Sequence, residues 1–230
     1  MQDAPIQDPT PAEAPPAGYR KGGEARARIL QAALTVFGEH GFKGATTRQI
    51  AEAAGVNLPA LKYYFGGKRG LYLACAQDIV GRYQQRMLPL VSEAHAALGA
   101  PMTPADARAR LKAVLRPLAE LLVGAGQAEV WMAFVLKEMA EQGPAFGVLY
   151  GQLWAPGVEL TAGLIARALG QAETGPAARL RALLLISSLS AFGAARPVSL
   201  KFLDWPDARG ERFERLVEIL DAQVDSLANP

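Results

Sequence analysis

The sequence predicts an all-α protein in two parts, a three-helix segment that contains a helix-turn-helix and a longer helical segment after it. Three observations lead to this prediction. Apolar residues recur at helical spacing over most of the 230 residues, and no stretch shows the sustained alternation of a half-buried strand. Gly and Pro residues separate these periodic stretches at intervals typical of helix connections. Finally, residues 43–69 have the pattern of two short helices around a Gly-centred turn.

The chain begins with a segment that differs from the rest. Residues 1–19 are rich in proline and contain few side chains that could pack, so we expect a disordered tail. A first helix is expected from about Glu24 to His40, ended by Gly41. Its inward face is expected to carry Ile29, Ala33, Val36 and Phe37.

The helix-turn-helix is expected at residues 47–65. Thr46 or Thr47 can cap a helix that runs to about Ala54, Gly55 allows the positive φ of a sharp turn, and Asn57 can cap the second helix. The buried face of this second helix is expected to carry Leu58, Leu61 and Phe65. Its outer face is expected to carry Pro59, Ala60, Lys62 and Tyr63. A small, basic and aromatic outer face is typical of a helix that lies in the major groove of DNA, although these residues alone also allow an ordinary helical hairpin.

The positive charge is concentrated in the same region. Residues 19–70 contain nine Lys or Arg and three Glu, a net charge of +6. Residues 1–18 contain three acids and no base, and residues 71–230 contain 15 bases and 16 acids. This distribution is typical of a domain that binds phosphates.

Everything after the helix-turn-helix also has the pattern of helices. A long helix is expected from near Lys68 to about Met87, with a kinked continuation past Pro89 towards Leu98. Further helices are expected at 104–123, 128–142, 144–169 with a bend near Pro156, 176–195 and 211–228. The connections between them are expected at 99–104, 124–127, 170–176 and 196–210.

The last two long helices are more apolar than the surface layer of a monomer requires. A helix that is apolar on more than one face must be buried on both sides. A two-fold dimer would bury this surplus, and a monomer that covers these helices itself is the alternative. The residues expected in the dimer interface are Leu180, Leu184, Phe213, Leu216 and Leu220.

Aromatic side chains are concentrated between residues 131 and 154. At spacings of four and eight residues, Phe146, Tyr150 and Trp154 would share one helix face. Such residues line small-molecule pockets, with plain core packing as the alternative. The residues expected around a ligand are Trp131, Phe134, Lys137, Glu138, Phe146, Tyr150 and Trp154, with Arg167 as a further polar contact.

Other kinds of site find little support in the sequence. His40 and His95 have no Cys, Asp or Glu cluster at metal-ligand spacing, and no nucleotide-binding or nucleophile motif occurs. We therefore expect no catalytic residue, metal or cofactor. The lone Cys75 excludes an internal disulfide and is expected to be a small buried apolar residue in a reducing cytoplasm. Without an 18-residue apolar run or a signal-peptide pattern, we expect a cytoplasmic protein with no membrane partner.

Residues 25–75 resemble the DNA-binding domain of the TetR family of bacterial transcriptional regulators. The resemblance rests on RILQAALTVFGEHGFKGATTRQIAEAAGV at 28–56 and LKYYFGGKRGLYLA at 61–74. A weaker likeness to the subgroup with a CecR-type C-terminal domain rests on FVLKEMAEQGPAFGVLYGQL at 134–153 and FLDWPD at 202–207. Lys62 and Leu58 depart from the residues common in the family, which bears on the base sequence read and not on the fold.

The resemblance implies a DNA-binding domain at 20–67 and a ligand-binding and dimerisation domain at 68–228. It implies a ligand-responsive repressor that binds a palindromic operator as a homodimer, with a largely apolar effector. Lys62 and Tyr63 would meet the major groove beside Pro59 and Ala60. The residues expected near phosphates are Thr47, Arg48, Tyr64 and Lys68, with Arg20, Lys21 and Arg26 at the backbone or a minor groove. Two alternatives remain, an architectural DNA binder with little sequence preference and a ligand-binding helical protein that does not engage DNA.

Overall fold

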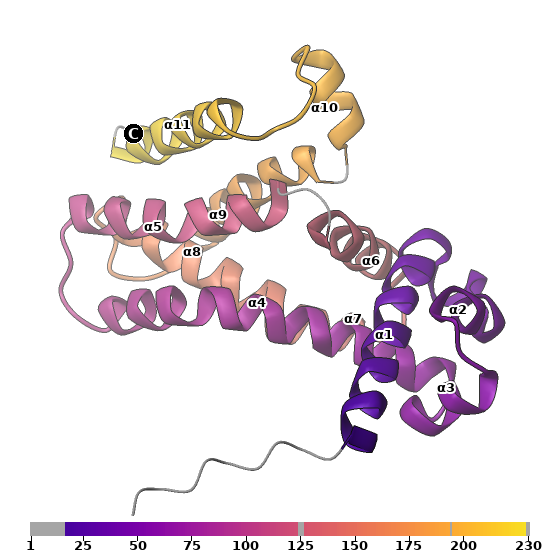
Figure 1. The fold of residues 1–230 in the computed structure, drawn as a ribbon. Helices are drawn as coiled ribbons and strands as arrows, with labels where there is room; N and C mark the ends of the chain where they lie inside the picture. The colour runs from indigo at the N-terminus through magenta and orange to yellow at the C-terminus, as the bar shows by residue number, and fades with distance from the viewer. Residues whose placement is uncertain (1–16, 124–126, 194, 229–230) are drawn as a thin grey trace, which may run out of the picture.

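The computed structural model describes residues 17–123, 127–193 and 195–228. Within these ranges every regular element is a helix, which confirms the predicted all-α class (Figure 1). By length and apolar composition, no single helix among the described residues could cross a membrane. Among the described residues, one bent pair of helices, Pro176–Phe192 and Arg196–Phe202, passes that test together.

The helices α1 (Ala17–Gly44), α2 (Thr47–Ala54) and α3 (Leu58–Phe65) pack together at one end of the molecule (Figure 1). α1 begins before the expected Glu24, so residues 17–19 are helical and do not belong to the predicted tail. The rest of that tail lies outside the described residues. Gly41 interrupts the helical backbone with φ 69° and ψ 178°, close to the predicted helix end. The four predicted inward residues are all buried: Ile29, Ala33, Val36 and Phe37.

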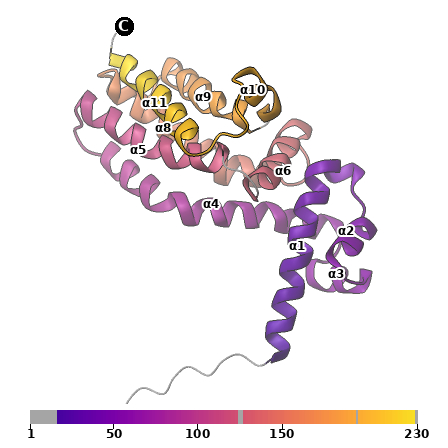
Figure 2. The same cartoon turned by 45° about the horizontal axis from the view of Figure 1, so that its top comes forward.

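The helix α4 (Lys68–Leu98) joins the two ends of the molecule. It is a single helix of 31 residues that contains Pro89, so the predicted end near Met87 is wrong and the helix continues to Leu98, as the alternative allowed. Its first half contributes Leu71, Tyr72 and Cys75 to a core shared with α1. Its second half contributes Met87 to a separate core. Figure 2 shows α4 running from the α1–α3 end beneath the remaining helices.

The second core is built around α8 (Ala155–Ala168). This helix packs against α4, α5 (Pro104–Val123) and α9 (Pro176–Leu189), and nearly all of its residues from Leu160 to Ala168 are buried. α11 (Glu211–Asp225) lies against α5, and η3 (Ser226–Ala228) follows it. α6 (Gln127–Glu141) packs against α1 and α5, so it lies between the two cores (Figures 1 and 2).

Two predicted stretches of the C-terminal part differ from the structure. The single helix expected at 144–169 is divided into α7 (Phe146–Leu149), the π-helix η1 (Tyr150–Trp154) and α8. Pro156 has no N–H to continue the α-helical ladder, and the N–H of Ala155 instead donates to the Tyr150 carbonyl in an i→i−5 bond. The connection expected at 196–210 contains α10 (Arg196–Phe202), and the helix expected to reach 195 ends at Leu189, followed by η2 (Ser190–Phe192).

Candidate DNA-binding surface and candidate ligand cavity

A capping box fixes the start of the helix-turn-helix. Thr46 Oγ1 accepts the N–H of Gln49 at 3.2 Å, and Gln49 Oε1 accepts the N–H of Thr46 at 2.8 Å. Of the two predicted caps, Thr46 is therefore the one that is used, and Thr47 is the first helical residue. This arrangement satisfies two backbone donors that the helix itself leaves free.

The turn has the conformation that its residues predicted. Gly55 adopts the left-handed conformation, with φ 62° and ψ 40°, which ends α2. Asn57 Oδ1 accepts the N–H of Ala60 at 2.9 Å and caps α3, with Pro59 in its first turn. Leu61 and Phe65 are buried beneath α3, but Leu58 is 47% exposed and the prediction of its burial is wrong. It is the first residue of α3, where the underlying core has already ended.

The outer face of α3 presents four predicted DNA-contacting residues to solvent. Tyr63 is 84% exposed, Lys62 and Pro59 are exposed, and Ala60 is half-buried. The half-buried Tyr64 packs edge-on against Tyr63, with ring centroids 5.1 Å apart. The outer face of α3 therefore carries Pro59 and the small Ala60 in its first turn, and basic and aromatic side chains towards its end.

The predicted phosphate contacts are less uniform. Arg48 is exposed and its Nε lies 3.2 Å from Glu52 Oε1, whereas Thr47 is half-buried. Lys68 Nζ donates to the Lys43 carbonyl at 3.3 Å, and it lies 4.9 Å from the centre of the Phe42 ring. Lys68 thus connects the start of α4 to the end of α1, and this contact positions the Lys68 ammonium beside α3.

Basic side chains elsewhere on this end of the molecule are also exposed. The guanidinium of Arg26 lies 5.2 Å from the Phe65 ring centre on the side of α1. The side chains of Arg20 and Lys21 lie outside the described residues. The exposed basic residues described here are Arg26, Arg28, Lys43, Arg48, Lys62 and Arg69. The net positive charge inferred from the sequence is therefore on the solvent-facing surface.

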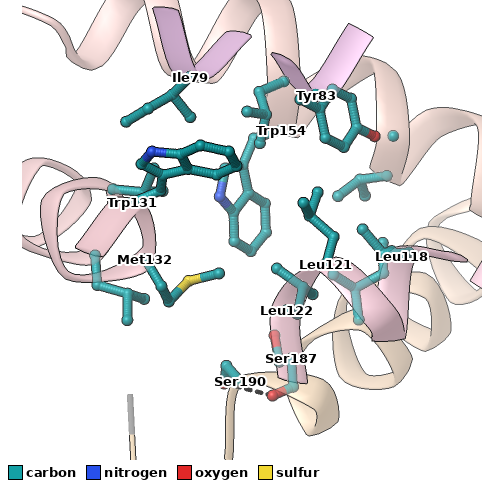
Figure 3. A pocket seen from close by; sticks show the side chains of 16 residues that line it. Ile79, Tyr83, Leu118, Leu121, Leu122, Trp131, Met132, Trp154, Ser187 and Ser190 are labelled. Carbon is teal, nitrogen blue, oxygen red and sulfur yellow. Dashed lines mark hydrogen bonds between the residues drawn. The ribbon is translucent and has the colours of Figure 1, made fainter. Parts of the chain in front are cut away.

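A cavity of about 190 Å³ lies in the C-terminal part, where α4, α5, α6, η1, α8 and α9 meet. We call it the aromatic cavity. Figure 3 shows the indole rings of Trp131 and Trp154 close together at its centre, with Leu118, Leu121 and Leu122 opposite. Among the sixteen described residues that line it, none is charged. The cavity is therefore suited to an apolar molecule.

Polar groups at the cavity are few. Tyr83 contributes a hydroxyl whose pKa is raised by burial. Ser187 and Ser190 lie at the opposite side, where Ser190 Oγ donates to the Ser187 carbonyl at 2.5 Å (Figure 3). Trp131 Nε1 is buried and has no hydrogen-bond partner among the residues that the structure describes. The Arg82 guanidinium lies 5.3 Å from the Trp131 ring centre.

Only two of the seven residues predicted around a ligand line this cavity, Trp131 and Trp154. Phe146 and Tyr150 stack on each other with centroids 5.8 Å apart, and Tyr150 is 53% exposed. The shared face expected for these two and Trp154 is wrong because the π-helical turn between them changes the residue period. Phe134 is fully buried among Phe37 and Tyr72 in the first core.

The predicted polar contacts Lys137, Glu138 and Arg167 are also elsewhere. Glu138 is fully buried and accepts hydrogen bonds from Tyr72 Oη and from the N–H of Ala145, both at 2.6 Å. Burial and this carboxylate raise the pKa of Tyr72. Arg167 donates to the Leu98 carbonyl, at the far end of α4. Glu138 thus links α4, α6 and the start of α7 instead of facing a ligand.

The described cavity residues that the sequence did not predict come from α4 and α5, and also from α6, η1, α8, α9 and η2. Ile79, Tyr83 and the three leucines of α5 carry no signal beyond ordinary helical periodicity. Only the three-dimensional packing brings them opposite Trp131.

The face of α9 and α11 keeps apolar side chains in solvent. Leu180, Leu184 and Ile219 are 58%, 64% and 56% exposed. Phe213 and Leu216 are half-buried, whereas Leu220 is 4% exposed and packs in the second core. Leu220 is therefore buried within its own chain, and the single chain does not present it at a surface where a dimer could form.

Comparisons with known proteins agree with this architecture. The family described as "Bacterial regulatory proteins, tetR family" matches residues 29–75. The family described as "HTH-type transcriptional dual regulator CecR, C-terminal domain" matches residues 107–229. The CecR protein of Shigella flexneri is 30% identical over 212 residues, which cover 91% of this chain and 94% of CecR. The chain belongs to the TetR family. It is a transcriptional regulator of the CecR type with a DNA-binding helix-turn-helix, and not an enzyme.

Solved structures show the same fold. A putative transcriptional regulator from Pseudomonas aeruginosa PAO1 has a TM-score of 0.60 at 24% identity and covers 88% of this chain and 89% of its own. FadR from Bacillus subtilis, solved in complex with stearoyl-CoA, has a TM-score of 0.54 at 16% identity and covers 88% and 97%. At these identities the likeness concerns the fold of this TetR-family regulator.

Proposed function

We propose that this regulator is a homodimeric repressor that binds a palindromic operator and is released from it by a largely apolar small molecule. The observation that carries the proposal is the aromatic cavity, which adjoins the helix that packs against α1. The DNA-contacting residues, the dimer interface and the coupling between cavity and DNA are each supported by separate features.

The surface of α3 supports direct contact with bases. Lys62 and Tyr63 are exposed on its outer face, with Pro59 and Ala60 at its start. A lysine in the major groove donates to the O6 and N7 acceptors of guanine. Phosphate contacts are proposed for Thr47, Arg48, Tyr64 and Lys68, of which the basic side chains come from the helices before and after α3.

The exposed face of α9 and α11 supports a homodimer. The side chains of Leu180, Leu184 and Ile219 are mostly exposed to solvent in the single chain, and that of Leu183 is 41% exposed. Several exposed large apolar side chains on two helices are typical of a protein–protein interface. To bind a palindromic operator, a two-fold dimer formed at this face must hold its two α3 helices about 34 Å apart, the spacing of successive major grooves.

α6 supports coupling between a ligand and the DNA-binding helices. It contributes Trp131 to the aromatic cavity, and from the same helix Phe134 and Glu138 pack into the core shared with α1 and α4. A ligand that moves Trp131 therefore acts on a rigid helix that also supports α1. The similarly folded FadR was solved with stearoyl-CoA, a molecule with a long apolar chain.

The test uses fluorescence anisotropy on labelled DNA from the region upstream of the gene, together with a thermal-shift screen of small molecules. A compound at a hundredfold excess over its Kd should stabilise the protein by about 2.7 kcal/mol, and the same compound should release the DNA. Trp154→Ala should abolish both responses and leave DNA affinity nearly unchanged. The control Trp205→Ala, at a tryptophan that does not line the cavity, should retain them.

Three results would contradict the proposal in different ways. Equal affinity for unrelated DNA would indicate an architectural DNA binder, and no DNA binding would indicate a ligand-binding protein of another kind. A folded Trp154→Ala protein that responds normally to the compound would show that the effector binds outside the aromatic cavity.

A further inference from the structure

A second hollow, which we call the outer cleft, adjoins the aromatic cavity. Its volume is about 410 Å³, and it lies between α1, α5, α6 and η2. Leu122, Met132 and Leu136 line both spaces. These three side chains therefore form the wall between the aromatic cavity and the outer cleft.

Met132 is the part of this wall that can move most easily. Methionine is unbranched, with three rotatable bonds, whereas the two leucines are branched and stiffer. Figure 3 shows the Met132 thioether at the edge of the cavity, below the two indole rings. On the cleft side, a Cβ at Gly193 would lie 3.2 Å from Met132 Cγ, so the glycine leaves space for this side chain.

The two spaces differ in their charged groups. The aromatic cavity has none among its described lining residues, whereas the outer cleft is lined by Glu129 and Lys137. Glu129 Oε1 lies 3.3 Å from Nε of Arg196, whose side chain is only 14% exposed. The Glu129 charge is therefore balanced by a largely buried guanidinium.

Lys137 is held less firmly. Its Nζ lies 3.5 Å from Glu141 Oε1 on the same helix, and the two side chains are 35% and 38% exposed. A partly exposed pair at i,i+4 contributes little free energy, so the ammonium can exchange this partner for another anion at small cost. The outer cleft thus offers a positive charge next to an apolar cavity.

We propose that the aromatic cavity and the outer cleft form one bipartite site, divided by Met132, for an amphipathic small molecule with an anionic end. The apolar rings lie between Trp131 and Trp154, and the anionic group lies in the outer cleft beside Lys137. This inference rests on the proposed effector function and adds the charge and orientation of the effector.

The outer cleft would place the anionic end of the molecule next to α1, a helix of the DNA-binding part. Gly38 of α1 lines the cleft, and a Cβ there would lie 3.3 Å from Cβ of Ala133 on α6. The two helices are therefore in close contact at this point. A group bound in the cleft lies against this junction, whereas a molecule confined to the aromatic cavity contacts α6 and, among the described residues, none of α1.

Two fluorescent probes that differ in one group test the proposal. 8-Anilinonaphthalene-1-sulfonate carries a sulfonate, and N-phenyl-1-naphthylamine has the same ring system without it. Both should bind the wild-type protein, and both should lose binding in Trp154→Ala, which distinguishes the cavity from the exposed apolar face of α9. Lys137→Gln should weaken the sulfonate probe about tenfold, because a hydrogen bond to a charged group is lost, and change the neutral probe less than about twofold. Lys201→Gln, at an exposed lysine of α10, is the matched control.

The role of Met132 is tested by stopped-flow association of the same probes. Met132→Ala should increase the association rate of the sulfonate probe at least about threefold, because the movable part of the wall is removed. Met139→Ala, at a half-buried methionine of α6 that lines neither space, should leave the rate unchanged. Equal association rates in the wild type and Met132→Ala would show that Met132 does not separate the aromatic cavity from the outer cleft.

The outcomes separate this inference from the proposed function. If Lys137→Gln weakens both probes equally or neither, the bipartite site is wrong and the effector cavity stands. The same holds if only the neutral probe binds. If neither probe binds the folded wild-type protein and no compound raises its melting temperature, both proposals are wrong.

Discussion

The hydrogen bond between Tyr72 and Glu138 is expected to make a large contribution to stability in the first core, where α1, α4 and α6 meet. Tyr72→Phe removes the hydroxyl and keeps the ring, so the edge-on contact with Phe37, at 4.7 Å between centroids, is retained. The substitution therefore isolates the effect of one hydrogen bond.

The magnitude follows from burial and charge. Glu138 has no exposed surface, and only Tyr72 Oη and the N–H of Ala145 donate to it among the described residues, each at 2.6 Å. Removal of one donor leaves a buried carboxylate that is half-satisfied. A hydrogen bond to a charged group contributes about 1.5–3 kcal/mol, and we expect Tyr72→Phe to lower the free energy of unfolding by that amount.

Urea denaturation at neutral pH measures this loss, with Tyr83→Phe as the matched control. The Tyr83 hydroxyl makes no hydrogen bond to the described residues at the aromatic cavity, so the control should change the free energy of unfolding by less than about 0.5 kcal/mol. A double-mutant cycle with Glu138→Gln should give a coupling energy of at least about 1 kcal/mol. Equal losses for the two Tyr→Phe variants, or a coupling energy near zero, would refute the reasoning.

Three further predictions concern DNA, assembly and pH. Lys62→Ala should cost about 1–3 kcal/mol at the operator and relax base preference at one position per half-site, and an unchanged preference in a binding-selection experiment would exclude this contact. Leu184→Asp should give folded monomers by light scattering, whereas Leu220→Asp should unfold the chain, because only Leu220 is buried within one protomer. If Leu184→Asp is still a folded dimer, the interface lies elsewhere. Burial raises the pKa of the Cys75 thiol in the folded chain above its ordinary 9.0. As the pH rises, the thiol therefore ionises in the unfolded chain before it does so in the folded chain, and the free energy of unfolding falls. Above pH 9 the free energy of unfolding should fall by about 1.4 kcal/mol per pH unit more in the wild type than in Cys75→Ala, and parallel urea titrations of the two proteins check this difference.

The helix-turn-helix could be predicted from the sequence because its signals are local. The caps at Thr46 and Asn57 act over three residues, and Gly55 is placed by the one turn that needs a positive φ. The error at Leu58 shows the limit of such patterns. Helical spacing gives the direction of a side chain, but it does not show where the core beneath the helix ends.

The ligand cavity could be predicted only in part because its lining is not local. Trp131 and Trp154 were found because aromatic residues are conspicuous in the sequence, but the helical period assumed between Tyr150 and Trp154 does not hold through a π-helical turn. Glu138 shows a second difficulty. The sequence predicted it as a polar contact to a ligand, whereas Tyr72, 66 residues earlier, makes it a buried acceptor.

The length of α4 has a mechanical consequence for DNA binding. Tyr83 lines the aromatic cavity and Lys68 begins the helix next to α3, so about 22 Å of continuous helix separates the cavity from the DNA-facing end at 1.5 Å per residue. A tilt of about 5° at Tyr83 would carry the end at Lys68 through about 2 Å, enough to lengthen a 2.9 Å hydrogen bond to a base beyond the usual limit of about 3.5 Å. In a two-fold dimer both half-sites would lose register together. Under the proposed function, a small rotation of α4 at the cavity would therefore be sufficient to break contacts between α3 and the bases.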